Sequence, residues 1–446
     1  IVYDNENFNL AGTVVDYNSI WEIDDPPPLF INPDSGDYHL QDISPCIGAG
    51  IDSVQIDGTW YYAPDTDIED NIRPNPTGSS PDIGAYENPL AEPAHNSLIY
   101  VSTDGNDDGS MGIESDPFAT IQAAIDYAWD GDTILVSAGT YYENINFNGK
   151  NIALIGEDRE TTIIDGGQNG SVVTIVNNED IYMKNLYIYN GYTVSSGGGG
   201  ISCNSNNGTI NLIIDNLIIS GNYTSNFGGG LHSQSSNNIS IYNSIIENNS
   251  ADQGGNGLSL DCSGACENNI INTIINNNFT SQSNNTGGGI RASGGNYLIE
   301  DVTISNNQAN VRGGGIYFSN ESQVTINRVL FNNNTCVLGG AIHNDGSSDL
   351  IINNSTFVNH QQTYYADGGG TAQIQNSIFT DVADDYMYGN IDLIVEYSNI
   401  GGGGFGIDNV NNPSSGIIYL EGNIDADPQF SDTSNNDFTL QPTSPC

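Results

Sequence analysis

Three residues that could carry chemistry, Arg291, Tyr317 and His343, each stand two positions after the end of a glycine cluster. An arginine can neutralise the carboxylate of an acidic sugar, and a nearby tyrosine or histidine can remove the proton from the adjacent carbon. These are the groups that a polysaccharide lyase uses. The alternative is an exposed ladder of mixed polar side chains that has no catalytic role.

The elements that would position these residues recur along the chain. Glycine clusters return every 26 to 32 residues, and an apolar residue follows each of them. A period of this length predicts a solenoid whose successive turns stack. Because side chains alternate between the two faces of a strand, the residue after each apolar one should point outward and align with its counterparts. The expected outward column is Ser202, His232, Ser259, Arg291, Tyr317 and His343.

A second outward column should lie two residues further along each strand. It comprises Asn204, Gln234, Asp261, Ser293, Ser319 and Asp345. Asp345 would then lie close to the three residues that could carry chemistry. If this surface binds a polysaccharide, His232, Asp261 and Asp345 are the candidate substrate-binding residues.

A further strand in each turn is followed, at a fixed distance, by a residue that is most often asparagine. The residues at this position are Asn190, Gly221, Asn248, Asn277, Asn306, Asn333, Asn359 and Asp381. Stacked turns would place them about 4.8 Å apart, so that their side chains could hydrogen-bond along the stack and satisfy polar groups at a buried corner. Asn222, Asn278 and Asn320 also fit the N-glycosylation sequon, which is the alternative use of asparagine here.

An acidic segment resembles part of a calcium-binding loop. Asp104, Asn106 and Asp108 precede a glycine in the order that such a loop requires. The acid expected later in the loop is replaced by Ser115, with Glu114 beside it. The three loop residues and Glu114 are therefore the candidate ligands for Ca²⁺, and the alternative is an acidic turn without a metal.

The charge balance is strongly acidic, with 55 Asp and Glu against 7 Lys and Arg and a net charge of −48. Such a surface repels nucleic acid and anionic lipid, whereas it attracts Ca²⁺ or cationic surfaces. The sequence contains no run of about 18 consecutive apolar residues, so it predicts no segment that spans a membrane. We therefore expect neither a nucleic-acid partner nor membrane insertion.

The six cysteines do not follow the spacing of a zinc or haem site. Cys262 and Cys266 flank a short loop that a disulfide could close. Cys203 and Cys336 lie among apolar residues and are expected to be buried thiols.

The two ends of the chain repeat each other. Ser44-Pro45-Cys46 returns 400 positions later as Ser444-Pro445-Cys446, and residues upstream match in the same register. We therefore expect residues 1–88 to be the C-terminal part of a preceding unit, residues 89–97 to be a linker, and residues 98–446 to be a solenoid truncated at its C-terminal segment. One amphipathic helix is predicted near 117–129, with Pro117 in its first turn after an Asp116 or Ser115 cap, covering the open end of the solenoid.

The alternation of Gly-Gly-Gly-Ile or Gly-Gly-Ala-Ile with a strand ending in Asn-Asn resembles the repeats of secreted right-handed parallel β-helix proteins, the pectin-lyase-like superfamily. It also resembles the GGA(I/L) and FxxN repeats of polymorphic outer-membrane adhesin proteins. Residues 98–156 resemble the N-terminal capping region of such β-helices, and residues 28–87 and 427–446 resemble their C-terminal region. The resemblance implies an all-β, right-handed parallel β-helix with an N-terminal capping helix.

This superfamily includes lyases, glycosidases, adhesins and spacers, so the fold does not decide the function. The sequence lacks the dense Asp cluster of pectate-lyase-like enzymes and the paired Asp motifs of polygalacturonase-like enzymes. We therefore predict an extracellular or cell-surface structural or adhesive module, whose tandem units join end to end into a stalk, fibre or filament and contact a surface polysaccharide. The alternative is a carbohydrate-active β-helix, a lyase or a glycan-binding module, that uses Arg291, Tyr317 and His343.

Overall fold

The computed structural model describes residues 28–56, 58–92, 94–110, 112–194, 197–205, 208–345, 347–367, 369–380, 387–389, 392–401, 407–408 and 416–446. The chain divides into two compact units, the first formed by residues 1–97 with 106–117 and the second by residues 98–105 with 118–446. Asp381, which the sequence places in the asparagine column, lies outside the described residues.

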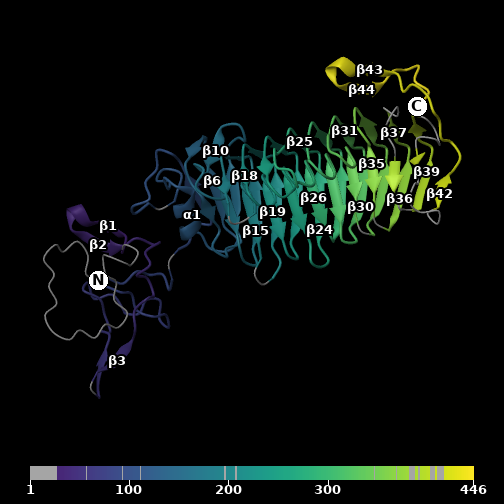
Figure 1. Cartoon of the computed structure of the whole chain (residues 1–446). Helices are drawn as coiled ribbons and strands as arrows, with labels where there is room; N and C mark the ends of the chain where they lie inside the picture. Colours follow the sequence, from purple (N-terminus) through teal and green to yellow (C-terminus); the bar gives the residue numbers. More distant parts are fainter. Residues whose placement is uncertain are drawn as a thin grey trace. The chain divides into compact units, whose positions relative to one another are not determined.

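The second unit is a parallel β-solenoid whose turns stack into three long sheets (Figure 1). In the part of the chain that the structure describes, sheet 1 has 13 strands: β5 (Leu98–Val101), β6 (Thr133–Val136), β9 (Ala153–Gly156), β12 (Asp180–Lys184), β16 (Asn211–Asp215), β20 (Asn238–Tyr242), β24 (Glu267–Ile271), β27 (Asn296–Glu300), β30 (Gln323–Asn327), β33 (Asp349–Asn353), β36 (Thr371–Gln375), β39 (Asp392–Glu396) and β42 (Ile417–Tyr419).

The other two sheets run beside it along the same axis. Over the same described residues, sheet 2 has 11 strands: β7 (Gly139–Tyr141), β10 (Thr162–Asp165), β13 (Tyr187–Tyr189), β17 (Ile218–Ser220), β21 (Ile245–Glu247), β25 (Ile274–Asn276), β28 (Thr303–Ser305), β31 (Leu330–Asn332), β34 (Thr356–Val358), β37 (Ile378–Phe379) and β40 (Asn399–Ile400). Sheet 3, counted likewise, has 11: β8 (Ile145–Asn146), β11 (Val173–Ile175), β15 (Ile201–Asn204), β19 (Leu231–Gln234), β23 (Leu258–Asp261), β26 (Ile290–Ser293), β29 (Ile316–Ser319), β32 (Ile342–Asn344), β35 (Tyr364–Ala366), β38 (Met387–Gly389) and β41 (Ile407–Asp408). A short ladder links β14 (Tyr192–Thr193), β18 (Tyr223–Thr224) and β22 (Ser250–Ala251).

The core of the solenoid consists of like residues stacked on successive turns. Ile290 pairs in register with Ile316, which pairs with Ile342, and all three are 0 % exposed. The rings of Phe357 and Phe379 stack with their centroids 4.3 Å apart. Stacking removes apolar surface from water at every turn, which contributes about 25 cal/mol per Å² buried. The predicted superposition of the three isoleucines is confirmed.

The buried asparagine ladder lies one residue later than the sequence predicts. Asn248 and Asn277, from the predicted column, are exposed and have φ values of 54° and 51°. Asparagine suits these corners because it tolerates the left-handed conformation. The next residues, Asn249, Asn278 and Asn307, are each 0 % exposed. Asn249 Nδ2 donates to Asn278 Oδ1 at 3.1 Å, and Asn278 Nδ2 donates to Asn307 Oδ1 at 3.0 Å.

This ladder also bears on the glycosylation sequons. Asn222 is 1 % exposed and Asn278 is 0 % exposed. Asn222 Nδ2 donates to Asn249 Oδ1 at 3.0 Å, so its amide nitrogen is already used inside the fold. These two asparagines are therefore not accessible for glycosylation in the folded chain.

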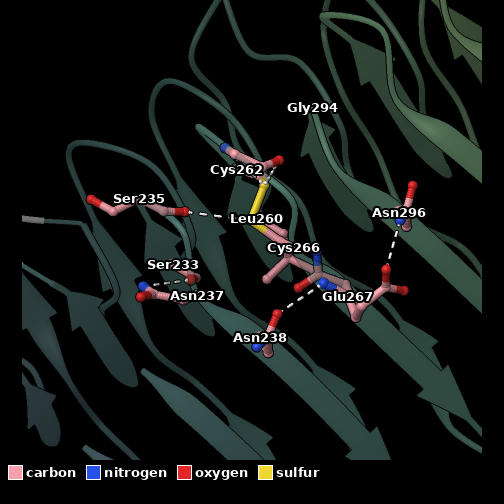
Figure 2. The surroundings of a disulfide bond; sticks show 12 residues. Ser233, Ser235, Asn237, Asn238, Leu260, Cys262, Cys266, Glu267, Gly294 and Asn296 are labelled. Carbon is pink, nitrogen blue, oxygen red and sulfur yellow. Dashed lines mark hydrogen bonds between the residues drawn. A yellow bond between two sulfur atoms is a disulfide. The ribbon is translucent and has the colours of Figure 1, made fainter. Parts of the chain in front are cut away.

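The loop between β23 and β24 is closed by the predicted disulfide between Cys262 and Cys266 (Figure 2). The next turn passes over it at Gly294 and Gly295, whose φ values are 67° and 72°. A Cβ on Gly295 would lie 2.9 Å from Cys262 Sγ. Glycine is therefore required where the chain crosses the disulfide. Cys203 is buried, as predicted, and Cys336 is half-buried.

The predicted helix is shorter than expected. Helix α1 spans Ile121–Tyr127 and begins after Thr120, whose side chain accepts a hydrogen bond from Ala123 N. Phe118 cannot join it, because its backbone bonds to Tyr100 and Ser102 as part of a bridge to β5. The Pro117 start and the Asp116 or Ser115 cap are therefore wrong. Among the described residues, no helix has the length and hydropathy that a membrane crossing needs.

The first unit has little regular structure. Over its described residues it contains two hairpins, β1 (Phe30–Asn32) with β2 (Asp37–Leu40) around the 3₁₀ helix η1 (Pro33–Ser35), and β3 (Ser53–Ile56) with β4 (Thr59–Tyr62). Its small core is built on Leu40, Cys46 and Ile47. The predicted linker 89–97 contributes Leu90 to this core, and Ala94 N donates to Asp42 O at 2.7 Å. That segment is thus packed over part of its length.

A related hairpin occurs near the end of the second unit. Strands β43 (Phe430–Asp432) and β44 (Asp437–Leu440) flank the 3₁₀ helix η3 (Thr433–Asn435). Asn332 Nδ2 donates to Asn436 Oδ1 at 3.2 Å, which places this hairpin beside sheet 2 (Figure 1).

Candidate functional site

The predicted line of Arg291, Tyr317 and His343 is present in sheet 3. Arg291 on β26 pairs in register with Tyr317 on β29, which pairs with His343 on β32. The glycine spacing therefore predicts correctly which residues are vertical neighbours. Their role in chemistry stays a prediction.

The column is covered, so the expectation of an exposed ladder is wrong. His232 is 5 % exposed, and the side chain of His343 is 0 % exposed. The segments before the glycine clusters fold over it. A Cβ on Gly197 would lie 2.2 Å from the His232 ring, and a Cβ on Gly254 would lie 3.0 Å from Arg291 Cδ. Glycine at these places lets the backbone approach the column closely enough to bury it.

At one end of the column, Arg312 connects two carboxylates. Its Nη1 lies 2.6 Å from Asp345 Oδ2, and its Nη2 lies 3.3 Å from Asp367 Oδ2. Tyr317 donates its hydroxyl to Asp345 Oδ2 at 2.8 Å. His343 Nε2 lies 3.2 Å from Asp367 Oδ1. The arginine, the tyrosine and the histidine thus each have an acidic partner within the protein.

Two members of this cluster, Arg312 and Asp367, are not predicted by the sequence. Asp367 directly follows β35 as Asp345 follows β32, and these strands pair in register. Extending the outward column by one more turn would have found it. Arg312 lies on a short chain of bridges with Thr286 and Leu338, where no residue type recurs. No repeated signal therefore points to Arg312.

The surroundings of the cluster shift the pKa values of Asp367 and Tyr317. The hydrogen bond from His343, helped by the nearby charge of Arg312, lowers the pKa of Asp367, so this carboxylate stays ionised. Burial, followed by the hydrogen bond to Asp345, raises the pKa of Tyr317. The Tyr317 hydroxyl is therefore protonated near neutral pH, and its role as a base stays a prediction.

The same cluster has some features of a metal centre. Ligand atoms of His343, Asp345 and Asp367 lie within 4.8 Å of one another, the one such group of three within the described ranges. The guanidinium of Arg312 already contacts both carboxylates. A cation would have to displace that charge and break its bonds. The arrangement therefore fits an internal ion-pair network better than a metal site.

A second charged group surrounds Arg291 on the preceding turns. Arg291 forms an ion pair with Asp261, and its Cζ lies 4.5 Å from the centroid of the Phe227 ring. Burial lowers the pKa of His232, against the attraction of Asp261. His232 is therefore neutral near pH 7. The predicted substrate-binding residues His232 and Asp261 are thus engaged with or buried by the protein itself, and their role stays a prediction.

The candidate calcium ligands are divided between the two units. Asp104 belongs to the second unit, whereas Asn106, Asp108 and Glu114 belong to the first. Asn106 uses its side chain locally, with Oδ1 accepting from Asp108 N at 3.2 Å and Nδ2 donating to Asp108 O at 2.8 Å. This is the geometry of a polar turn, and calcium binding there stays a prediction.

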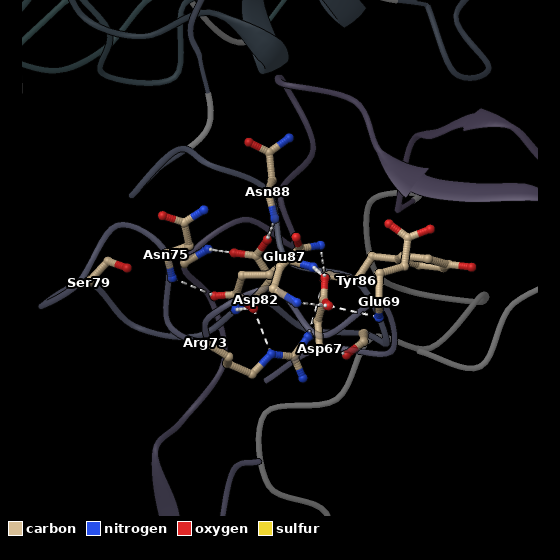
Figure 3. A network of polar contacts seen from close by, with 12 residues as sticks. Asp67, Glu69, Arg73, Asn75, Ser79, Asp82, Tyr86, Glu87 and Asn88 are labelled. Atoms are coloured by element: carbon tan, nitrogen blue, oxygen red, sulfur yellow. Dashed lines mark hydrogen bonds and ion pairs between the residues drawn. The ribbon is translucent and has the colours of Figure 1, made fainter. Parts of the chain in front are cut away.

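The first unit contains a buried polar network (Figure 3). Arg73 Nε donates to Glu87 Oε2 at 2.6 Å, and the two side chains are 8 % and 0 % exposed. Asp82 accepts hydrogen bonds from Gly48 N at 2.7 Å and Asn88 N at 2.6 Å. Burial raises the pKa of Asp82. These bonds connect segments that are far apart in the sequence and have little regular secondary structure, so the network stabilises the fold of this unit.

A third carboxylate, Asp67, belongs to the same network. It accepts hydrogen bonds from Glu69 N, Asn71 N and Glu87 N at 2.9, 2.9 and 3.0 Å. Although burial opposes the shift, these bonds and one from the Asn71 side chain lower the pKa of Asp67 to about 2. The charged form of Asp67 therefore stabilises the fold of this unit.

Two of three comparisons with known proteins found a similarity. Residues 301–319 and 328–345 match the model of the Chlamydia polymorphic membrane protein repeat. A search of the curated proteins finds no match. Among solved structures, the chain is similar to a pectate lyase crystal structure, with 12 % identity and a TM-score of 0.35, over 79 % of this chain and 88 % of that chain. The chain is a parallel β-helix in which two segments match the polymorphic membrane protein repeat.

Proposed function

We propose that this chain is an extracellular structural or adhesive surface module and that it does not act as a lyase. The observation that carries the proposal is the pairing of the candidate catalytic groups with internal partners. Arg291 is paired with Asp261, Tyr317 donates to Asp345, and His343 bonds to Asp367. A lyase would have to present such groups to a substrate in an open cleft. The match to the polymorphic membrane protein repeat supports the same assignment.

The adhesive surface is the outer face of sheet 1. Its central column is Tyr182, Ile213, Ser240, Asn269, Leu298, Thr325, Ile351, Gln373 and Ile394, aligned in register. Ile213 and Ile351 are 42 % and 41 % exposed. A groove of about 290 Å³ includes Asn269, Leu298 and Thr325 in its lining. Apolar side chains beside amides and hydroxyls suit the ring faces and hydroxyl groups of a surface polysaccharide.

Repetition extends this surface along one axis. The recurrence of residues 44–46 at 444–446 favours units that follow one another at a fixed interval. Units joined end to end would form a stalk or filament, in which each contributes the same outer face.

The test measures adhesion and catalysis on the same preparation. Beads coated with the full chain are assayed for retention of soluble β-glucan and polygalacturonate, with and without Ca²⁺. The double variant Leu298→Asp and Ile351→Asp should lower retention about ten-fold, since it places charges in the contact face. Tyr142→Asp is the control, because Tyr142 is 77 % exposed and lies outside this face.

The catalytic arm follows the ultraviolet absorbance of unsaturated sugars with the same polymers. We expect no product. Product formation that disappears in His343→Ala would contradict the proposal and establish the lyase alternative. Equal retention by the double variant and the native chain would contradict the assignment of the contact face.

A further inference from the structure

One border of the groove on sheet 1 is a file of polar side chains that bond to one another along the stack. The file is formed by the first residue of each strand from β16 to β33. On the earlier turns the amides donate to the preceding turn. Asn238 Nδ2 donates to Asn211 Oδ1 at 2.8 Å, and Asn296 Nδ2 donates to Glu267 Oε1 at 2.7 Å (Figure 2).

The direction of this ladder reverses at the groove. Gln323 Nε2 donates to Asp349 Oδ2 on the following turn, at 3.2 Å. Asn296 and Gln323 are neighbours in register, but they donate away from each other. The reversal therefore separates these two side chains, whereas the amides of Asn211 and Asn238 are joined by a bond.

Two hydrogen-bond acceptors remain open where the ladder reverses. Among the described residues, no group donates to Asn296 Oδ1 or to Gln323 Oε1, and both side chains are exposed and line the groove. Each carbonyl oxygen has lone pairs that a hydroxyl group can use. The groove thus offers acceptors that the protein itself does not occupy.

The rest of the groove suits a sugar ring. Leu298 and Ile351 supply apolar surface, and Thr325 supplies a hydroxyl between them in register. The groove has a volume of about 290 Å³ and involves residues on β24, β27, β30 and β33. Four stacked strands extend over about 14 Å, which is a suitable length for a short oligosaccharide.

The charges of the chain exclude an acidic sugar as the ligand of this groove. Each of the seven Lys and Arg side chains bonds to an acceptor of the chain itself. Beside the groove, Arg328 pairs with Asp301 at 2.6 Å and with Glu300 at 2.9 Å. The groove lining includes the carboxylates of Glu267 and Asp349 and contains no basic residue. A ligand with a negative charge would therefore be repelled.

We propose that the groove binds a neutral, hydroxyl-rich glycan, whose hydroxyl groups donate to Asn296 Oδ1 and Gln323 Oε1 while a ring face packs on Leu298. This inference rests on the adhesive function proposed above and names the chemical class of its ligand. The carboxylate of a uronate only accepts hydrogen bonds, so it gains nothing from these two oxygens. Asn296 and Gln323 are thus the residues that determine specificity.

The first experiment compares two ligands of equal length on the full chain. Binding of a β-glucan hexasaccharide and of a galacturonate hexasaccharide is measured by titration calorimetry without Ca²⁺. We expect the neutral ligand to bind at least about ten-fold more tightly. Its dissociation constant should change less than about two-fold between about 0.05 and about 0.5 M NaCl, because salt screens only interactions between charges.

The second experiment removes the two open acceptors. The double variant Asn296→Leu and Gln323→Met should weaken binding of the neutral hexasaccharide about ten-fold, since two hydrogen bonds to the ligand are lost. Asn211→Leu is the matched control. Asn211 belongs to the same file but lies outside the groove, and its Oδ1 already accepts from Asn238. This variant should bind the neutral hexasaccharide as the native chain does.

The outcomes separate the class of ligand from the adhesive function. Equal or tighter binding of the galacturonate, or equal weakening by the double variant and by Asn211→Leu, would overturn the inference. If bead retention still depended on Leu298 and Ile351, the adhesive function would stand without it. Binding of the neutral hexasaccharide by a chain whose beads retain no polymer would leave the groove assignment standing and overturn the adhesive function alone.

Discussion

The two units of this chain reach stability by different means. The solenoid has one continuous core, in which residues from Ile99 to Ile400 belong to a single apolar cluster. The core of the first unit is built on Leu40, Cys46 and Ile47, and its remaining buried groups include an ion pair and further carboxylates. Repeated rungs let many small apolar contacts add up, whereas the irregular unit depends on a few polar bonds. We therefore expect the stability of the first unit to be most sensitive to substitutions that remove a buried charge. The stability of the solenoid should be most sensitive to substitutions that reduce the volume of a buried side chain.

The largest expected effect is the removal of a stacked ring from the solenoid. Phe357 is fully buried between rings on the neighbouring turns, with centroids 4.6 and 4.3 Å away. Phe357→Ala should lower the free energy of unfolding by about 4 kcal/mol, from lost burial and from the cavity. Phe279→Ala is the control, because Phe279 is 56 % exposed. Equal losses of unfolding free energy in the two variants, measured by denaturant unfolding, would contradict a stacked core.

The matching change in the first unit removes a charge. Arg73→Met leaves the carboxylate of Glu87, 0 % exposed, without its ion-pair partner. We expect a loss of about 3 kcal/mol in the stability of this unit. Arg328→Met is the matched control, since that side chain is 50 % exposed and should have little measurable effect. Protection from proteolysis across residues 28–92 reports the result, and an unchanged pattern in Arg73→Met would show that the network is dispensable.

A smaller effect is expected at the asparagine ladder. Asn278→Ala removes the acceptor used by Asn249 N and Asn249 Nδ2, at 3.0 and 3.1 Å. Asn249 N then has no partner and Asn249 Nδ2 keeps only its bond to Ile219 O, which should cost about 2 kcal/mol. Asn277→Gly changes the neighbouring residue, which has φ of 51° and is exposed, and should stay within about 0.5 kcal/mol of the native chain. If denaturant unfolding showed a larger loss of stability for Asn277→Gly than for Asn278→Ala, the assignment of the buried ladder to Asn278 would be wrong.

The smallest effect is a dependence on pH in the first unit. The pKa of Asp67 is lowered to about 2 in the folded chain. A lowered carboxyl pKa contributes stability above its ordinary value near 4, and this contribution disappears as the pH falls through about 2. Native stability should exceed that of Asp67→Asn by about 1 kcal/mol at pH 5, and the difference should shrink toward pH 2. A constant difference across this range would mean that the charge of Asp67 is irrelevant.

The sequence predicts the repeated features of the solenoid well, for a physical reason. Each rung carries the same residue types, so the register of Arg291, Tyr317 and His343 could be read from glycine spacing alone. The burial of this column could not, because it depends on the segments before the glycine clusters folding over it. The bridged residues in those segments, Gly254, Thr286, Arg312 and Leu338 on successive turns, share no residue type. The error of one residue in the asparagine ladder has a similar origin. Of two adjacent asparagines, one takes the left-handed backbone conformation at the corner and the other buries its side-chain amide. The residue type alone does not show which asparagine does which.

The first unit was harder to predict. The network of Arg73, Asp82 and Glu87 joins residues that are separated along the chain and do not belong to any sequence repeat. No periodicity reveals which acid will be buried beside which base, since this depends on tertiary packing. Likewise, Arg312 lies at a position that Thr286 and Leu338 occupy on the neighbouring turns, so no repeated residue type marks it. A repeat pattern in the sequence does not predict contacts between residues at non-repeated positions.

The register of the turns can be measured directly by cross-linking two cysteines placed on neighbouring rungs. Ile274 pairs with Thr303, and Thr303 pairs with Leu330. Cysteines at 274 and 303 should form a disulfide on mild oxidation, because neighbouring strands are about 4.8 Å apart and a disulfide spans about 4.4 to 6.8 Å between Cα atoms. Cysteines at 274 and 330, two rungs apart, should not. Cross-linking of the second pair but not the first, identified by peptide mass mapping, would contradict the stacked solenoid.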